Sequence, residues 1–200
     1  MHLVEALSEV LEATRGGMSV DHSYRVLTSR LLLRPLTEHD LEIVLRWRRH
    51  EHIRKWFQDD LTIDPKQQLT WYERYRQRED DMMFVAVVLD ENKPIGAGSL
   101  YRINKLSRTA EFGRVFIGEA DAQGMGYGEE IVRGITDFGI EMLSLRWIEL
   151  FVKITNTNAI RTYTNCGYVH DRKYRPSNSR DLGSIVRMIR TAPPRWKGER

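Results

Sequence analysis

The stretch Gln123-Gly124-Met125-Gly126-Tyr127-Gly128 decides the fold. It follows an apolar run typical of a strand, Thr109 to Ile117, and precedes apolar residues spaced three to four apart, Ile131 to Met142. Glycines let the backbone approach a ligand closely, and free amide groups at a helix start attract anions. The stretch therefore predicts a phosphate-binding turn. It matches neither a P-loop, which needs Gly-Lys-Ser/Thr, nor the dinucleotide fingerprint.

Length and composition fit one folded domain. The chain has 200 residues, 41% of them hydrophobic, and no apolar run reaches the roughly 18 residues of a membrane helix. The single cysteine, Cys166, excludes an internal disulfide framework and a multi-cysteine zinc site, and no metal is expected. Acidic residues near the start, such as Glu5 and Glu9, argue against a signal peptide, so we expect a cytoplasmic protein. The formal net charge of +3 is too small to indicate nucleic acid as a partner.

Outward from the glycine stretch, the pattern alternates between strand and helix periods. We expect residues 1–28 to be an N-terminal extension with a short helix, residues 29–192 to form the domain, and residues 193–200 to be a tail. The expected strands cover 30–36, 82–89, 94–100, 109–117, 146–154, 168–174 and 184–189. The expected helices begin at Thr37, at Asp64-Pro65, after Gly128 and at Asn158.

Two spaced motifs resemble those of the GCN5-related N-acetyltransferases, the GNAT superfamily. Gln123, Gly126 and Gly128 match Gln/Arg-x-x-Gly-x-Gly/Ala, and Asn156, Ala159, Tyr163, Gly167 and Tyr168 match Asn-x-x-Ala-x-x-x-Tyr-x-x-x-Gly-Phe/Tyr. The resemblance covers about residues 30 to 190. It implies an α/β fold with a mixed, largely antiparallel sheet, flanking helices and splayed central strands.

The same resemblance implies a donor site for acetyl-CoA. The CoA pyrophosphate would lie on the amides of Gln123 to Gly128, and the acetyl carbonyl on backbone amides of the preceding strand, which would act as an oxyanion hole. Asn156 would bind the pantetheine arm or hold the next helix. The implied donor-binding residues are Arg114, Val115, Phe116, Ile117, Gln123, Gly124, Met125, Gly126, Tyr127, Gly128, Asn156 and Ala159.

Two residues are candidates for the chemistry of direct acetyl transfer. Tyr163 matches the family position from which a phenol protonates the departing thiolate. Glu111 is the candidate base, acting directly or through a water, and a structural strand residue paired with an arginine is the alternative for it. His170 is the rival base. Cys166 is not needed as a nucleophile, because this family acetylates by direct attack.

The acceptor is expected near the first helices, where aromatic and basic residues interleave. We expect Arg54, Lys55, Trp56, Trp71 and Arg74 to bind it, unless the aromatic residues only pack on the core. Three runs, His52 to Phe57, Gln68 to Tyr72 and Ala110 to Gly113, resemble the branch that acetylates nucleotide-linked amino sugars in pseudaminic-acid biosynthesis.

Other functions stay open beside this one. Thr28, Arg30, Leu31, Leu33, Arg34 and Pro35 match the opening of the acetyltransferases that modify the N-termini of ribosomal proteins. An aminoglycoside acetyltransferase is a third reading, and a non-catalytic CoA-binding or RNA-binding module is the alternative outside enzymes. The expected partner is a small-molecule amine, with neither membrane nor nucleic acid, and a homodimer is the expected assembly.

Overall fold

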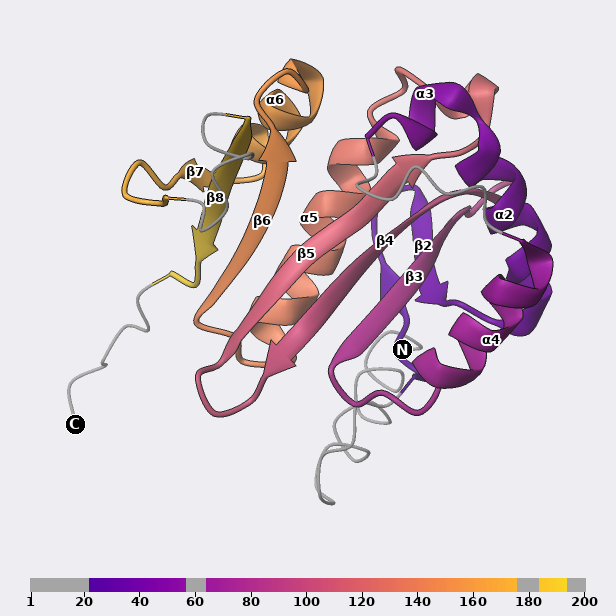
Figure 1. Ribbon diagram of the computed structural model, residues 1–200, viewed down its shortest axis with the longest axis horizontal. Coiled ribbons are helices and arrows are strands. Elements are labelled where there is room, and N and C mark those ends of the chain that lie inside the picture. The colour runs from indigo at the N-terminus through magenta and orange to yellow at the C-terminus, as the bar shows by residue number, and fades with distance from the viewer. Residues whose placement is uncertain (1–21, 57–63, 176–183, 194–200) are drawn as a thin grey trace.

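The computed structural model describes residues 22–56, 64–175 and 184–193 (Figure 1). The first expected helix and most of the expected tail lie outside these ranges. The strands are β1 (Val26–Leu27), β2 (Leu31–Pro35), β3 (Asp81–Val88), β4 (Lys93–Asn104), β5 (Thr109–Ile117), β6 (Trp147–Lys153), β7 (Val169–His170) and β8 (Ile185–Thr191). The helices are α2 (Leu41–Arg49), α3 (Glu51–Arg54), α4 (Pro65–Tyr75), α5 (Tyr127–Glu141) and α6 (Thr157–Asn165), with short 3₁₀ turns η1 (Glu38–Asp40) and η2 (Ala120–Ala122).

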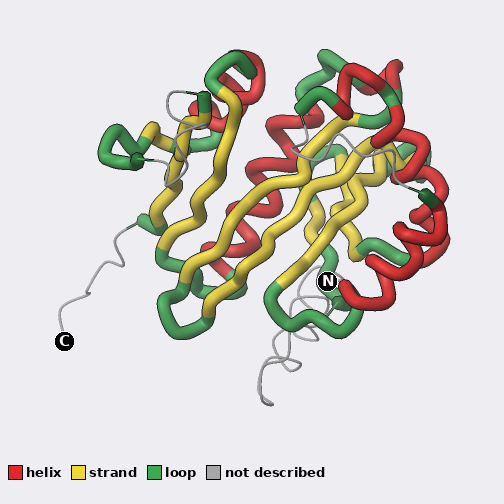
Figure 2. The backbone as a smooth tube through the Cα atoms, viewed as in Figure 1, coloured by secondary structure: helices red, strands yellow, loops and turns green. Residues whose placement is uncertain are grey.

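The strands form one mixed sheet in the order β1-β2-β3-β4-β5-β6-β8-β7. Every neighbouring pair is antiparallel except β5 and β6, which are parallel. Helix α5 packs behind the sheet, and α2 and α4 lie on the opposite side, over the strands of the first half (Figures 1 and 2). The predicted α/β fold with a largely antiparallel sheet is confirmed.

Strand β3 is buried along its whole length because both faces of the sheet are covered there. Phe84 and Ala86 belong to the apolar cluster that includes Ile131 of α5. The alternate residues, such as Val85, belong to a second cluster that includes Trp47 of α2. Successive side chains of a strand point to opposite faces, so one strand serves two cores.

The two parallel strands part after a short contact. Their paired residues run only from Thr109 with Trp147 to Glu111 with Glu149, although both strands continue beyond that point. On the other side of β5, the pairing with β4 shifts register between Ala97 and Ser99, where two residues of β5 face one of β4. The splayed central strands expected from the family resemblance are therefore present, with a bulge beside the opening.

The structure differs from the predicted elements at a few places. Strand β7 ends at His170 and not at residue 174, because Asp171 begins a turn in which its carboxylate accepts from the Lys173 amide, 3.0 Å away. Strand β1 pairs with β2 although it falls in the segment expected to be an extension. Helix α3 has four residues, too few for a periodic signal. None of the described helices is long and apolar enough to cross a membrane.

Candidate active site

The glycine stretch forms the turn between β5 and α5, as the sequence predicts. Gly124 and Gly126 have φ angles of 75° and 82°, a left-handed conformation that favours glycine, and Gly126 is the N-cap of α5. A Cβ built at Gly128 would meet no atom within 4 Å. Gly128 is therefore not required by packing, and the space above the helix start is open to a ligand. Amides at this helix start suit the CoA pyrophosphate.

The first residue of the motif connects the turn to the acceptor side. The amide nitrogen Nε2 of Gln123 lies 2.8 Å from Nε2 of His52, which belongs to α3. Sequence reasoning missed His52, because nothing in the local pattern links two residues so far apart in the chain. Helix α3 consequently lies against the glycine turn.

The bulge in β5 carries the amides expected at the acetyl group. Arg114 has a φ of 52°, and its Nη1 donates to both carboxylate oxygens of buried Asp81, at 2.7 and 2.9 Å. Its guanidinium also lies 4.4 Å from the ring centre of Tyr101. The side chain of Arg114 is thus committed to the protein, and the backbone of residues 114 to 117 is what the strand can offer a donor.

Glu111 is buried and paired with two groups at the point where the strands part. It accepts from the Tyr101 hydroxyl at 2.5 Å and from Nη1 of Arg102 at 2.6 Å. The Arg102 side chain is 72% exposed, so solvent competes for this ion pair. Pairing with an arginine, the alternative weighed for Glu111, is present, while its role as a base stays a prediction.

A second carboxylate lies beside Glu111. Glu149 is its register partner in β6, and aligned residues of parallel neighbours share a face about 4.8 Å apart. Nε of Arg187 donates to Glu149 at 2.5 Å, and Nη1 of the same arginine donates to Asp171 at 2.8 Å. Sequence reasoning missed Glu149 because only the strand register reveals the pair.

Tyr163 is 8% exposed, and its ring packs edge-on against Phe112 and Tyr168. Burial raises the pKa of Tyr163 well above its ordinary value, so the phenol stays protonated at neutral pH. Asn156 caps α6, since its side chain accepts from the Ala159 amide at 3.2 Å. His170 is exposed on β7, away from the parted strands in the sheet order.

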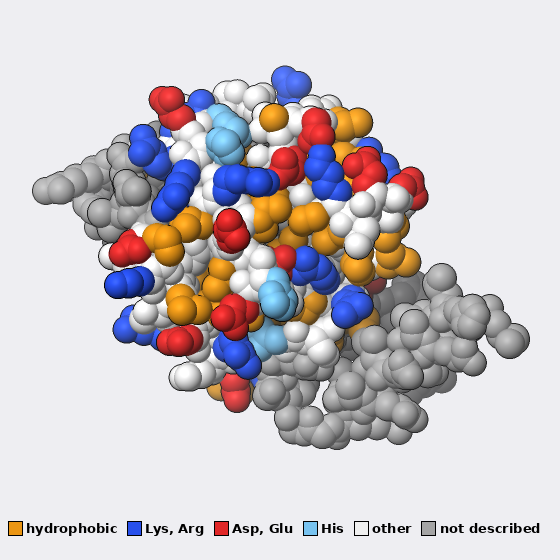
Figure 3. Space-filling model, turned by 90° about the vertical axis from the view of Figure 1, so that its right-hand side faces the viewer, with side chains coloured by type: hydrophobic (Ala, Val, Ile, Leu, Met, Phe, Trp, Pro, Cys, Tyr) orange, Lys and Arg blue, Asp and Glu red, His pale blue; other side chains and the backbone are white. Residues whose placement is uncertain are grey.

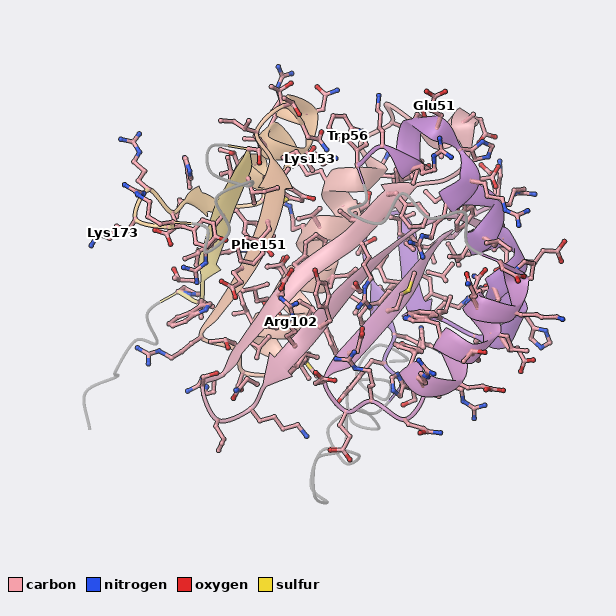
Figure 4. All side chains as sticks on the ribbon, in the orientation of Figure 1. Glu51, Trp56, Arg102, Phe151, Lys153 and Lys173 are labelled. Atoms are coloured by element: carbon pink, nitrogen blue, oxygen red, sulfur yellow. The ribbon has the colours of Figure 1, made fainter. Side chains whose placement is uncertain are left out.

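The residues expected at the acceptor lie in two places. Nζ of Lys153, at the end of β6, donates to the Lys55 carbonyl at 2.9 Å, and Trp56 lies close to this contact (Figure 4). Trp71 instead stacks on Tyr75 of the same helix, with ring centres 5.3 Å apart. The structure therefore brings Arg54 to Trp56 to the parted strands, but leaves Trp71 and Arg74 on α4, over the first half of the sheet.

Two further features concern the chemistry of the site, the thiol of Cys166 and the arrangement of metal-ligating side chains. Cys166 is buried, and burial raises the pKa of its thiol to about 11, so a thiolate is not formed at neutral pH. Within residues 22–56, 64–175 and 184–193, no group of three or more His, Cys, Asp or Glu side chains is arranged to hold a metal ion.

Comparison with known proteins gives one family. The model of the acetyltransferase (GNAT) domain matches residues 30–169. The chain is 28% identical to the spermidine N(1)-acetyltransferase of Vibrio cholerae over 147 residues, 72% of this chain and 82% of that protein. The crystal structure of the V. cholerae spermidine N-acetyltransferase with CoA and spermine has a TM-score of 0.72 at 24% identity, and it covers 82% of this chain and 96% of that one.

A dodecameric structure of the V. cholerae spermidine N-acetyltransferase has a TM-score of 0.65 at 24% identity and covers 82% of this chain and 95% of that one. These structures support the fold, and the family match spans most of the chain, including the glycine turn, the parted strands and Tyr163. The chain therefore belongs to the GNAT acetyltransferases, and it is an enzyme that takes the acetyl group of acetyl-CoA to an amine nitrogen.

Proposed function

We propose that the acceptor is an aliphatic polyamine such as spermidine. The observation that carries the proposal is the pair of neighbouring carboxylates, Glu111 and Glu149, at the base of the parted strands. Glu111 is paired with Arg102 and Glu149 with Arg187, but Arg102 is largely exposed, so an incoming ammonium group could take its place on the carboxylate. The name of the V. cholerae relative supports the same acceptor class.

The face that carries this pair is the front of the sheet at β5 and β6 (Figure 4). Arg102 and Phe151 lie on it, in front of β5 and β6, and no described helix covers β6 and β8 there (Figure 4). Phe151 packs against Tyr174, with ring centres 5.4 Å apart, which adds an apolar wall suited to methylene groups. A flexible polyamine chain carries ammonium groups that suit the carboxylates and methylene groups that suit the apolar wall.

The chemistry then follows from the groups at the opening. A carboxylate, Glu111 directly or through water, takes a proton from the bound ammonium, and the neutral nitrogen attacks the thioester carbonyl. Backbone amides of the β5 bulge stabilise the oxyanion. After the C–N bond has formed, the C–S bond breaks and the sulfur takes the proton of Tyr163. The acetylated nitrogen then loses its remaining surplus proton, which restores the phenol of Tyr163. The net products are the acetylated amine, the free thiol and one released proton.

On sequence alone, the basic first helices favour a nucleotide-linked amino sugar as the acceptor. The acceptor proposed here is instead a polyamine. The side of the molecule formed by the first helices carries basic and acidic side chains next to one another, and the basic ones do not form one continuous patch (Figure 3). Arg46 donates to Glu119 at 2.6 Å, and Arg34 is paired with Asp40. Such pairs leave less positive charge for a diphosphate than the composition of the helices indicates, and the relatives reported above are not named for amino sugars.

The remaining expectations have less support. The motif shared with ribosomal-protein acetyltransferases has no observation in its favour beyond the family itself. The carboxylate pair would also suit a cationic aminoglycoside, but the relatives reported above are named for polyamines. Assembly of several copies is part of the proposal, because the V. cholerae enzyme has a dodecameric structure. The homodimer and the cytoplasmic location stay predictions.

Replacement of Glu149 tests the acceptor proposal. Glu149→Gln should raise KM for spermidine by about tenfold to a hundredfold with little change in kcat, because a charge-assisted contact contributes roughly 1.5 to 3 kcal/mol. Asp171→Asn is the matched control: it removes a carboxylate from the same Arg187 on the side away from Glu111, and KM should stay near the wild-type value.

The measurement is steady-state thiol release with spermidine, a peptide N-terminus, an aminoglycoside and a UDP-linked amino sugar. A preference of the wild-type enzyme for any of the last three, or an equal rise of KM in both variants, would contradict the polyamine proposal.

A further inference from the structure

A cluster outside the family motifs joins the start of β2 to the first turn of α5. Oε1 of Glu130 accepts from the hydroxyls of Thr28 and Ser29, at 2.7 and 3.0 Å, and from the Arg30 amide at 2.8 Å. Oε2 accepts from Nε of Arg30 at 2.8 Å, and Nη2 of Arg30 lies 2.7 Å from the same oxygen. Four groups from about a hundred residues earlier in the chain therefore converge on one carboxylate.

The guanidinium of Arg30 also reaches the glycine turn itself. Its Nη1 donates to the carbonyl of Met125 at 3.0 Å, and its centre lies 4.3 Å from the ring centre of Tyr127. Its Nη2 is the nearest atom, at 3.6 Å, to a Cβ built on Gly126. Arg30 thus contacts the segment between the two left-handed glycines, which packing alone would leave with several conformations.

The charges explain why an arginine is needed at this place. Burial by itself raises the pKa of Glu130, but hydrogen bonds from Thr28, Arg30 and Ser29 outweigh it, and the net pKa lies below the ordinary range. The carboxylate is therefore charged at neutral pH, at the helix start where the phosphates of the donor are expected. A bare carboxylate there would repel them, and the planar fork of Arg30 neutralises it.

We propose that Arg30 is a positioning residue for the pyrophosphate of acetyl-CoA: it fixes the turn through the Met125 carbonyl and neutralises Glu130 beside the phosphates. Lysine could not replace it, because an ammonium group has no planar face to lie over the Tyr127 ring and no two-pronged contact for the carboxylate. The role concerns the donor alone, so it does not depend on which amine is the acceptor.

Direct binding measurements with three ligands test this role without any acceptor. CoA carries all phosphates, dephospho-CoA keeps the pyrophosphate and lacks the ribose phosphate, and pantetheine has no phosphate. Arg30→Gln should weaken CoA and dephospho-CoA by the same factor, about tenfold or more, because charge-assisted contacts are lost. Its affinity for pantetheine, measured by competition, should stay within about twofold of wild type, since the arm binds elsewhere.

Two more variants separate this role from general effects. Arg133→Gln removes the same charge from an ion pair with Glu129 on the same helix, with a similar exposure of 48% against 45% for Arg30, and Arg133 bonds to Glu129 and Asn165 instead of the turn. It should leave the three affinities unchanged, because Glu129 is 38% exposed and water screens its charge, whereas Glu130 is 12% exposed. The double variant Arg30→Gln/Glu130→Gln should bind CoA more tightly than Arg30→Gln, because the uncompensated carboxylate is gone.

Several results would overturn the proposal. Equal weakening of CoA and pantetheine would make Arg30 a merely structural residue. If Arg133→Gln weakened CoA binding as much as Arg30→Gln does, Arg30 would act only through the overall positive charge of the protein. Unchanged CoA binding in Arg30→Gln would mean that Arg30 has no role in donor binding. A double variant no better than Arg30→Gln would refute the neutralisation of Glu130.

Discussion

The buried surroundings of Tyr163 decide how this residue can contribute to acetyl transfer. Its raised pKa keeps the proton on the phenol, and among the described residues its hydroxyl makes no hydrogen bond. Tyr163→Phe should therefore lower kcat by about tenfold to a thousandfold, the range for a general acid, with CoA affinity nearly intact. Stopped assays of thiol release and calorimetry with CoA provide the two numbers.

Tyr168→Phe is the matched control for that variant. Tyr168 is also buried, but its hydroxyl lies 3.0 Å from that of Thr136, so its loss should lower stability and leave kcat within a few-fold. If Tyr163→Phe keeps wild-type kcat, Tyr163 only packs, and solvent must protonate the thiolate.

Sequence reasoning reached the residues whose role is local. The glycine turn, the Asn156 cap and Tyr163 all follow from short motifs, because their spacing along the chain sets their geometry. Glu149 could not be found in this way, since its role depends on the register of two strands. The same holds for His52, which reaches Gln123 only in the folded chain.

At the scale of the element, the entry to α2 depends on one buried ion pair. Both guanidinium Nη atoms of Arg34 donate to Asp40 at 2.7 Å, and the amide and hydroxyl of Thr37 donate to it as well. The sequence predicts Thr37 as the helix cap. In the structure Thr37 precedes the short turn η1, and Asp40 is the acceptor that organises it.

Replacement of Asp40 should destabilise this entry in a pH-dependent way. Burial raises the pKa of Asp40, but bonds from Arg34 and Thr37 outweigh it, and the net pKa is lowered. The stabilisation is then complete above the unfolded pKa of about 4 and is lost as pH falls through the lower folded value. Asp40→Asn should cost about 3 kcal/mol of unfolding free energy at neutral pH.

Chemical denaturation of both proteins across this range measures that difference. The two unfolding free energies should converge as the pH falls below about 4. A difference that is constant with pH would mean that Asp40 acts through packing and not through its charge.

Long elements could be predicted more closely from the sequence than short ones, although β4 continues four residues beyond its predicted end. Strand β5 has the predicted bounds, and α5 begins within two residues of its predicted start. Strand β1 and helix α3 are too short to show a period, and their stability comes from tertiary contacts. The predicted strand over 168–174 is wrong beyond His170, because side-chain bonds of Asp171 compete with the ladder.

In the molecule as a whole, the two parallel strands β5 and β6 lead to different parts of the candidate site. The glycine turn that is expected to bind the donor follows β5, the helix with Tyr163 follows β6, and the carboxylate pair lies where these strands separate. Composition alone favours an anionic acceptor, because it counts Arg46 of the first helices without its carboxylate partner Glu119. That pairing joins residues 73 positions apart in the sequence, so it could not be read from the chain itself.

Acetyl transfer to a polyamine can be tested by mass spectrometry of spermidine after incubation with the enzyme and acetyl-CoA, with the free thiol counted in the same sample. We expect spermidine to be heavier by one acetyl group and one thiol to be released for each product molecule. Thiol release without acetylated spermidine would contradict the polyamine acceptor, and the absence of both products would contradict acetyl transfer to this amine.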